Sequence, residues 1–195
     1  MKIKTGVLLG VAACLLCSAI YAPAQARGGH APIATQGHVQ WKRGTYQGLT
    51  PGQSSRQDVE KVFGKPGWEG KPEAEPGDEP TDDLMYDYTD VGGLKGRTSV
   101  IFDARSGLVK VIYLYPQGLT MEQAIAQYGK DYVKRGKGLG ACPTADDVRE
   151  SRRQPPPDEY PIFLVYPRSG LYVTVRSDNT VLEVGYLADC SSALP

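Results

Sequence analysis

Few side chains in this chain of 195 residues could do chemistry, and they lie far apart in the sequence. The two histidines, His30 and His38, both precede the region with regular hydrophobic patterning. A serine, threonine or cysteine nucleophile needs a base within hydrogen-bond reach, and a zinc site needs several such ligands close together. The histidine segment is interpreted as part of a flexible leader, with a weak surface metal site as the alternative. We therefore expect no enzyme activity, no catalytic residues, no metal and no cofactor.

Two further patterns do not predict active sites. Acidic side chains concentrate in residues 69–83, a proline-containing segment where nothing would hold two carboxylates at the separation that hydrolysis needs. The glycine-rich segment 136–140 follows no expected strand and opens no expected helix, so it does not indicate a phosphate-binding loop. The 22 basic and 22 acidic side chains cancel, which argues against nucleic acid as a partner.

Residues 1–26 are expected to be a secretory signal peptide. Two lysines precede an uncharged apolar stretch over 6–21, and small residues at 24 and 26 form a cleavage site. The alternative is a bacterial lipoprotein, lipidated at Cys14, but the apolar run continues past that cysteine. The chain is therefore expected in the periplasm or outside the cell, and at the outer membrane only if Cys14 is lipidated.

Cys142 and Cys190 remain after removal of the signal peptide, and an even number of cysteines in an exported chain favours a disulfide. The bond would close a loop of about 49 residues and stabilise the fold by roughly 4 kcal/mol. The metal alternative is weak because two cysteines without a nearby histidine form half a zinc site.

An internal repeat predicts two copies of one structural unit. Ser55 with Asp58, and Thr120 with Gln123, are capping-box patterns that begin a helix, and a glycine follows each cap after nine residues. Each helix precedes one strand and then a β-hairpin, and the two hairpins match at a shift of 73 residues without a gap. The expected strands span 84–89, 100–103 and 108–114 in the first unit and 162–167, 173–176 and 181–187 in the second.

The predicted fold class is α+β. It has two tandem repeats, each a helix with a three-stranded antiparallel sheet, and the helices pack on one sheet face. The expected organisation is a signal peptide (1–26), a flexible leader (27–44), a first repeat (45–117), a second repeat (118–190) and a tail (191–195).

The repeat pattern resembles the SmpA/OmlA family, also called BamE-like, and the related β-lactamase inhibitory proteins. Residues 118–120 (Gly-Leu-Thr), followed by Ala124 and Gly129, keep the spacing of the family motif. One departure is Asp131, which stands where the family motif has a proline. The resemblance covers residues 50–187.

The resemblance implies binding of a protein rather than catalysis. Assembly-factor members of the family typically carry one unit on a lipid anchor, whereas the inhibitory proteins carry two units whose joined sheet forms a concave saddle. The expected function is a non-catalytic protein-binding or scaffold module of the cell envelope, linked to outer-membrane protein assembly or envelope integrity. The alternative is a secreted or periplasmic inhibitor of a hydrolase such as a β-lactamase or a protease.

Strand side chains alternate between the two faces of a sheet, so the aligned repeats also predict which side chains face the helices. Val111 and Tyr113 align with Val184 and Tyr186, and all four are expected beneath the helices. The opposite face is unusually apolar, which favours a protein-binding surface, although loops covering it are the alternative. The predicted partner-binding residues are Met85, Ile101, Ile112, Leu114, Phe163, Val165, Tyr172 and Leu187.

Overall fold

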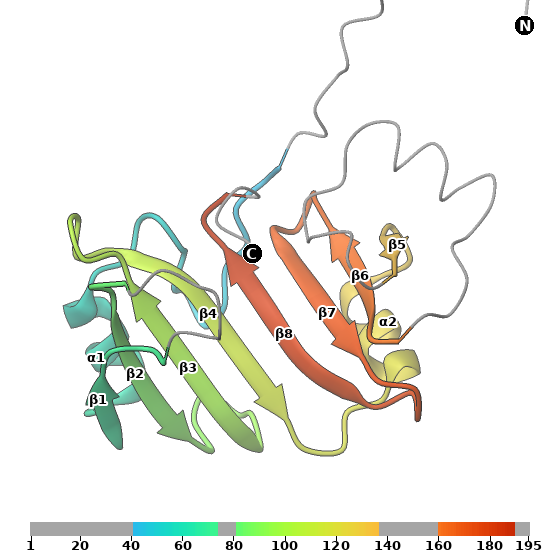
Figure 1. Cartoon of the computed structure of the whole chain (residues 1–195), viewed down its shortest axis with the longest axis horizontal. Helices are drawn as coiled ribbons and strands as arrows, with labels where there is room; N and C mark the ends of the chain where they lie inside the picture. Colours follow the sequence, from blue (N-terminus) through green and yellow to red (C-terminus); the bar gives the residue numbers. More distant parts are fainter. Residues whose placement is uncertain (1–40, 74–80, 137–159, 190–195) are drawn as a thin grey trace, which may run out of the picture. The chain divides into compact units, whose positions relative to one another are not determined.

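The computed structural model of the protein describes residues 41–73, 81–136 and 160–189 (Figure 1). These residues belong to a single unit of the chain. The signal peptide, Cys14, both histidines, Cys142 and Cys190 lie outside the described residues. The predicted signal peptide and the predicted disulfide therefore stay predictions.

Within the described residues, two short helices each precede four strands. The helices are α1 (Arg56–Phe63) and α2 (Met121–Tyr128). The strands are β1 (Trp68–Gly70), β2 (Leu84–Thr89), β3 (Gly96–Phe102), β4 (Val109–Pro116), β5 (Val133–Arg135), β6 (Ile162–Tyr166), β7 (Leu171–Val175) and β8 (Val181–Leu187).

Both capping boxes are confirmed. At the start of α1 the Asp58 backbone N–H donates to Ser55 Oγ at 3.3 Å, and the Ser55 backbone N–H donates to Asp58 Oδ2 at 3.0 Å. Thr120 and Gln123 make the same reciprocal pair at α2. These bonds satisfy amide groups that the first helical turn leaves without a partner.

All eight strands form one antiparallel sheet in the order β1-β2-β3-β4-β8-β7-β6-β5. The predicted fold of two helix-plus-three-strand repeats is therefore wrong, and the described fold is mostly β. Strands β4 and β8 pair directly, with Ile112 opposite Tyr186 and Leu114 opposite Val184. This pairing joins the two halves into a continuous sheet and leaves neither strand with an exposed edge.

Strands β1 and β5 were not expected from the sequence. Each has only three residues, too few to show the alternation of apolar and polar residues that identifies a strand. They complete the two outer edges of the sheet, where β1 pairs with β2 and β5 pairs with β6.

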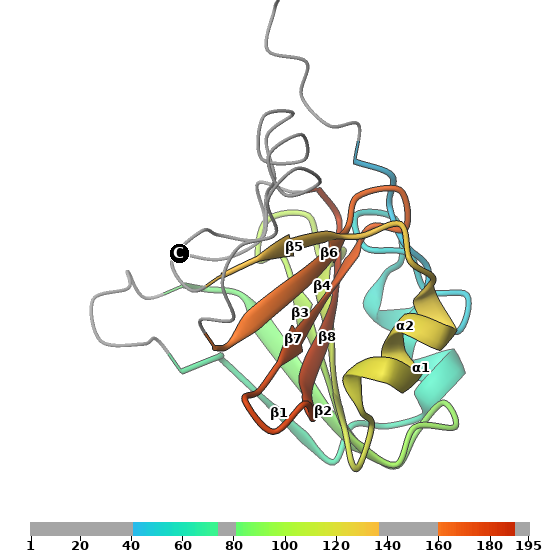
Figure 2. The same cartoon turned by 90° about the vertical axis from the view of Figure 1, so that its right-hand side faces the viewer.

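Both helices pack on the same face of the sheet, as Figure 2 shows. Val59 from α1 and Ala124 from α2 are fully buried in the core between the helices and the sheet. Aromatic rings contribute much of this core, and Tyr86 meets Phe102 edge-on at 4.8 Å between ring centroids. We call this the helix-covered face of the sheet.

A β-bulge interrupts each hairpin. Between β3 and β4 the register places Ile101 opposite Val111 but Phe102 opposite Val109, so Lys110 is the additional residue. Between β7 and β8 the corresponding shift makes Leu182 the additional residue. A bulge reverses the faces onto which the following side chains of that strand point.

The two hairpin turns also differ in length. Six residues (103–108) separate Phe102 from Val109, whereas five (176–180) separate Val175 from Val181. The gap-free alignment of the hairpins therefore matches each residue of β4 with the wrong residue of β8: it aligns Val109 with Leu182, whereas the structurally equivalent residue is Val181.

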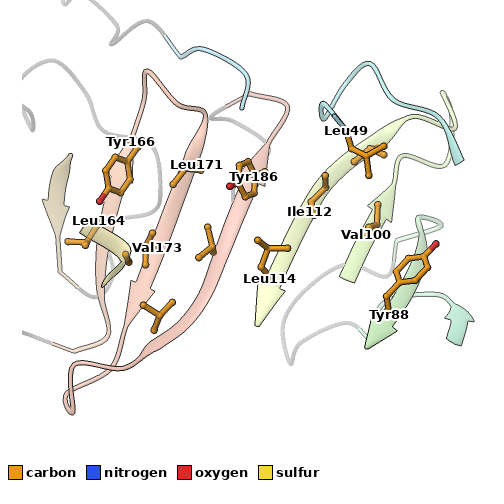
Figure 3. Packing of buried hydrophobic residues seen from close by; sticks show 14 of the residues in the cluster. Leu49, Tyr88, Val100, Ile112, Leu114, Leu164, Tyr166, Leu171, Val173 and Tyr186 are labelled. Atoms are coloured by element: carbon orange, nitrogen blue, oxygen red, sulfur yellow. The ribbon is translucent and has the colours of Figure 1, made fainter. Parts of the chain in front are cut away.

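The face predicted for Ile112 and Leu114 is consequently wrong. Both side chains lie in the helix-covered core, where they are 0% and 2% exposed (Figure 3). Val111 and Tyr113, expected beneath the helices, instead belong to the cluster on the opposite face.

We expect replacement of Lys110 by leucine to lower the free energy of unfolding by about 2 kcal/mol at neutral pH. Lys110 Nζ donates to Asp83 Oδ2 at 2.8 Å, and the Ala104 backbone N–H donates to Asp83 Oδ1 at 3.0 Å. Burial disfavours the Asp83 carboxylate, but these hydrogen bonds outweigh it and lower the pKa of Asp83. The equivalent bulge in the second hairpin already has a leucine, Leu182. The substitution therefore removes the cation and introduces a side chain that this kind of bulge accommodates.

The loss should be measured by urea unfolding at neutral pH and in acid. Because the folded-state pKa of Asp83 is lowered, its contribution is complete above the ordinary aspartate pKa and disappears as the pH falls. The difference between the variant and the wild type should therefore shrink in acid. Lys71→Leu is the control, because its ion pair with Asp82 is well exposed and screened by solvent, so its loss should change the free energy of unfolding far less. Equal losses for the two variants would contradict the prediction.

Candidate functional site

The face of the sheet opposite the helices carries one continuous row of directly paired residues, one from every strand. The pairing registers place each member directly opposite the next. Directly paired residues of neighbouring strands point to the same face. From β1 to β5 the row is Trp68, Asp87, Ser99, Tyr113, Gly185, Tyr172, Val165 and Val133.

Two glycines on this face make room for aromatic rings. A methyl group at Gly185 would lie only 2.6 Å from Cζ of Tyr172, so the tyrosine ring occupies the space over the glycine. Gly70 in the same way leaves room for the indole of Trp68. Tyr172 is fully buried, whereas Trp68 is 45% exposed. Trp68 therefore presents a large aromatic surface to solvent.

Charged groups lie beside the rings. The Tyr172 hydroxyl donates to Glu183 Oε1 at 2.7 Å, and the Arg97 guanidinium lies 4.2 Å from the ring centroid of Tyr115. On the neighbouring strands, the Ser99 hydroxyl donates to the carboxylate of Asp87. Each of these charged groups therefore already has a partner within the face. Arginine and tyrosine are both enriched at protein interfaces, where arginine can stack on an aromatic ring.

Most of the predicted partner-binding residues do lie on this face. Ile101, Phe163, Val165, Tyr172 and Leu187 gather into one apolar cluster. Met85 is directly opposite Ile101, which places it on the same side of the sheet. Ile112 and Leu114 do not belong here, as described above. The prediction that the face binds a partner stays a prediction.

The accessible residues differ from the predicted ones. Val165, Tyr172 and Leu187 are fully buried, so they support the face rather than contact a partner. Ile101 and Phe163 are partly exposed.

Sequence reasoning did not identify three aromatic residues of the face: Trp68, which is exposed, and Tyr113 and Tyr115, which are partly exposed. Trp68 lies on a strand too short to recognise, and Tyr113 was placed on the wrong side by the alignment of the hairpins. The difference of one residue between the two turns, which explains the error at Tyr113, is seen in the strand registers and not in the gap-free alignment of the two hairpin sequences.

We expect Glu183→Gln to stabilise the protein at neutral and alkaline pH. Burial raises the pKa of the Glu183 carboxyl above its ordinary value, although the Tyr172 hydroxyl and the Arg97 charge oppose this. The raised pKa means that stability is greatest when Glu183 is protonated and is lost as the pH rises through the folded-state value. Glutamine stays neutral and can still accept the hydrogen bond from Tyr172.

Urea unfolding across a pH series tests this expectation. The stability of the variant should exceed that of the wild type increasingly as the pH rises above the ordinary glutamate range, and the two should converge in acid. A variant less stable than the wild type at alkaline pH would show that the glutamate charge supports the fold.

Other kinds of site are not found in the described residues. There, no group of three or more histidine, cysteine, aspartate or glutamate side chains is placed to hold a metal ion. Over the same residues, neither helix has the length and apolar character needed to cross a membrane.

Comparison of the chain with protein-family models, with curated proteins and with solved structures finds no match. The resemblance noted in the sequence accordingly stays an expectation.

Proposed function

We propose that this chain is a non-catalytic, exported protein-binding module of the cell envelope that binds its partner with the sheet face opposite the helices. The observation that carries the proposal is the set of accessible rings and apolar side chains on this face. We call this set the aromatic face; it consists of Trp68, Tyr113, Tyr115, Ile101 and Phe163.

The composition of the aromatic face supports a protein partner. Tryptophan, tyrosine and arginine are the side chains most enriched at the energetic centres of protein interfaces. On the aromatic face Arg97 is already stacked on Tyr115, so little conformational freedom is left to lose on binding. The Glu183 and Asp87 carboxylates accept hydrogen bonds within the face. The partner surface that fits such a face is largely apolar.

The support beneath the rings favours a rigid binding surface. Tyr172 is packed over Gly185 and bonded to Glu183, and Phe163 meets Tyr172 edge-on at 6.1 Å between centroids. A pre-organised surface avoids part of the ordering cost of association. The continuous sheet carries the face across both halves of the chain.

A photo-reactive amino acid at position 68, introduced into the full chain in its native envelope, tests the proposal. The matched control is the same amino acid at position 62, because Val62 on α1 is 44% exposed and Trp68 is 45% exposed. We expect irradiation to give one discrete protein adduct at position 68 and none at position 62. The purified partner should then bind the purified chain. The proposal is contradicted if both positions give the same adducts or if position 68 gives none.

A further inference from the structure

A cavity of about 570 Å³ opens on the helix-covered side of the sheet, away from the aromatic face. Leu114 and Val184, which lie opposite one another where β4 and β8 join the two halves, form its base but are only 2% and 1% exposed. The apolar side chains that a ligand can reach are Leu94 and Leu119, which are both partly exposed. Its walls come from the turn at residues 46–47, the loop at 92–95 and helix α2. The volume is in the range of sites that hold small molecules or short peptides.

The walls carry many amide groups and a single charge. The polar side chains that line the cavity are Tyr46, Gln47, Lys95, Gln117, Gln123, Gln127 and Tyr128. Lys95 is the one ionised group among the lining residues that the structure describes, and no carboxylate accompanies it there. The cavity therefore favours a ligand with one negative charge, and its amides favour a ligand that both donates and accepts hydrogen bonds.

Two of the amides are held in a defined orientation. Gln47 Nε2 donates to the carbonyl oxygen of Gly92 at 2.7 Å, and a carbonyl can only accept, so Gln47 Oε1 is the atom left for a ligand. Gln123 Oε1 accepts from the Thr120 backbone N–H at 2.9 Å, so its Nε2 is left as a donor. The lining thus offers one fixed acceptor and one fixed donor.

We propose that this cavity binds the carboxyl-terminal end of a peptide whose last residue is aliphatic. The peptide carboxylate pairs with Lys95, and the aliphatic side chain packs against Leu94 and Leu119. A backbone N–H of the peptide donates to Gln47, and a backbone carbonyl accepts from Gln123.

Other ligand classes use less of the lining. A fatty acid supplies the charge, the apolar chain and an acceptor for Gln123, but it has no N–H or O–H group to donate to Gln47 Oε1. A neutral sugar supplies hydroxyl groups but leaves Lys95 unpaired and the side chains of Leu94 and Leu119 uncovered. The cavity and the aromatic face lie on opposite sides of the sheet, so the failure of either proposal leaves the other standing.

The first experiment uses the tripeptide N-acetyl-Gly-Val-Leu with a free carboxylate, titrated calorimetrically into the purified chain. We expect saturable binding that weakens about tenfold or more when the same peptide carries a carboxamide end, because a charge-assisted hydrogen bond is lost. Decanoate and N-acetylglucosamine are the competing probes. The proposal is overturned by equal affinity for the two peptides, by decanoate or the sugar binding as tightly as the acid peptide, or by no saturation up to about 10 mM.

The second experiment locates the site. Lys95→Gln removes the cation, and Gln123→Glu keeps the oxygen that caps α2 while removing the donor and adding a repelling charge. Each should weaken binding of the acid peptide about tenfold. Lys61→Gln is the control, because Lys61 lies on α1 outside the cavity with a side chain that is 74% exposed. If Lys95→Gln binds the peptide as Lys61→Gln does, the cavity is not the binding site.

Discussion

Replacing Gly170 by alanine should lower the free energy of unfolding by about 3 kcal/mol. Gly170 follows β6 in the turn to β7 and has a φ of +62°, in the left-handed region that favours glycine. A methyl group there would also overlap the backbone nitrogen of Gly44 and the carbonyl oxygen of Lys42. Backbone atoms cannot move aside as the end of a flexible side chain can, so the turn or the segment of Lys42 must shift.

Gly107→Ala separates the two causes. Gly107 has a similar φ of +71°, but a methyl group there meets nothing within 4 Å. Its replacement should cost only the strain of the left-handed backbone, about 1 kcal/mol. Urea unfolding followed by tryptophan emission suits the measurement, because Trp41 precedes Lys42 and packs against the apolar cluster. Equal losses for the two variants would mean that the segment at Lys42 does not pack against the turn.

Trp68→Glu should weaken binding of the envelope partner by about 30-fold or more while leaving stability within about 0.5 kcal/mol of the wild type. The indole is the most exposed large apolar group on the aromatic face, and tryptophan is one of the residue types most enriched among interface hot spots. A carboxylate in its place would have to be buried against an apolar partner without a counter-charge.

Val62→Glu is the matched control for this substitution. It introduces the same charge at nearly the same exposure, but on helix α1. Binding measured with the partner identified by cross-linking should be unchanged in this variant. If both variants weaken binding equally, added negative charge is the cause, and the aromatic face is not the contact surface.

Local signals in the sequence predicted the local structure well. The capping boxes at Ser55 and Thr120, and the ends of the helices at Gly64 and Gly129, are all confirmed. These features depend on contacts between residues a few positions apart, which the sequence displays directly. The two hairpins are confirmed for the same reason.

The assembly of the sheet could not be predicted in the same way. Pairing of β4 with β8 joins residues about 70 positions apart, and nothing in the pattern of either strand distinguishes that partner from solvent or a loop. The bulges at Lys110 and Leu182 add a second difficulty, because one additional residue in a strand reverses the sheet face to which all later side chains of that strand point. The structure therefore places Ile101 and Phe163 on the predicted side of the sheet, opposite the helices, whereas Ile112 and Leu114 of β4 lie on the other side.

The two outer strands leave little free edge on the described sheet. β1 and β5, at the ends of the sheet, have only three residues each, so each end offers few free backbone groups to a strand from another molecule. The long apolar strands β4 and β8 are enclosed in the middle, where a second chain cannot reach them. Lengthening β1 or β5 by apolar residues would therefore promote aggregation through growth of the sheet from molecule to molecule, without any change in the aromatic face.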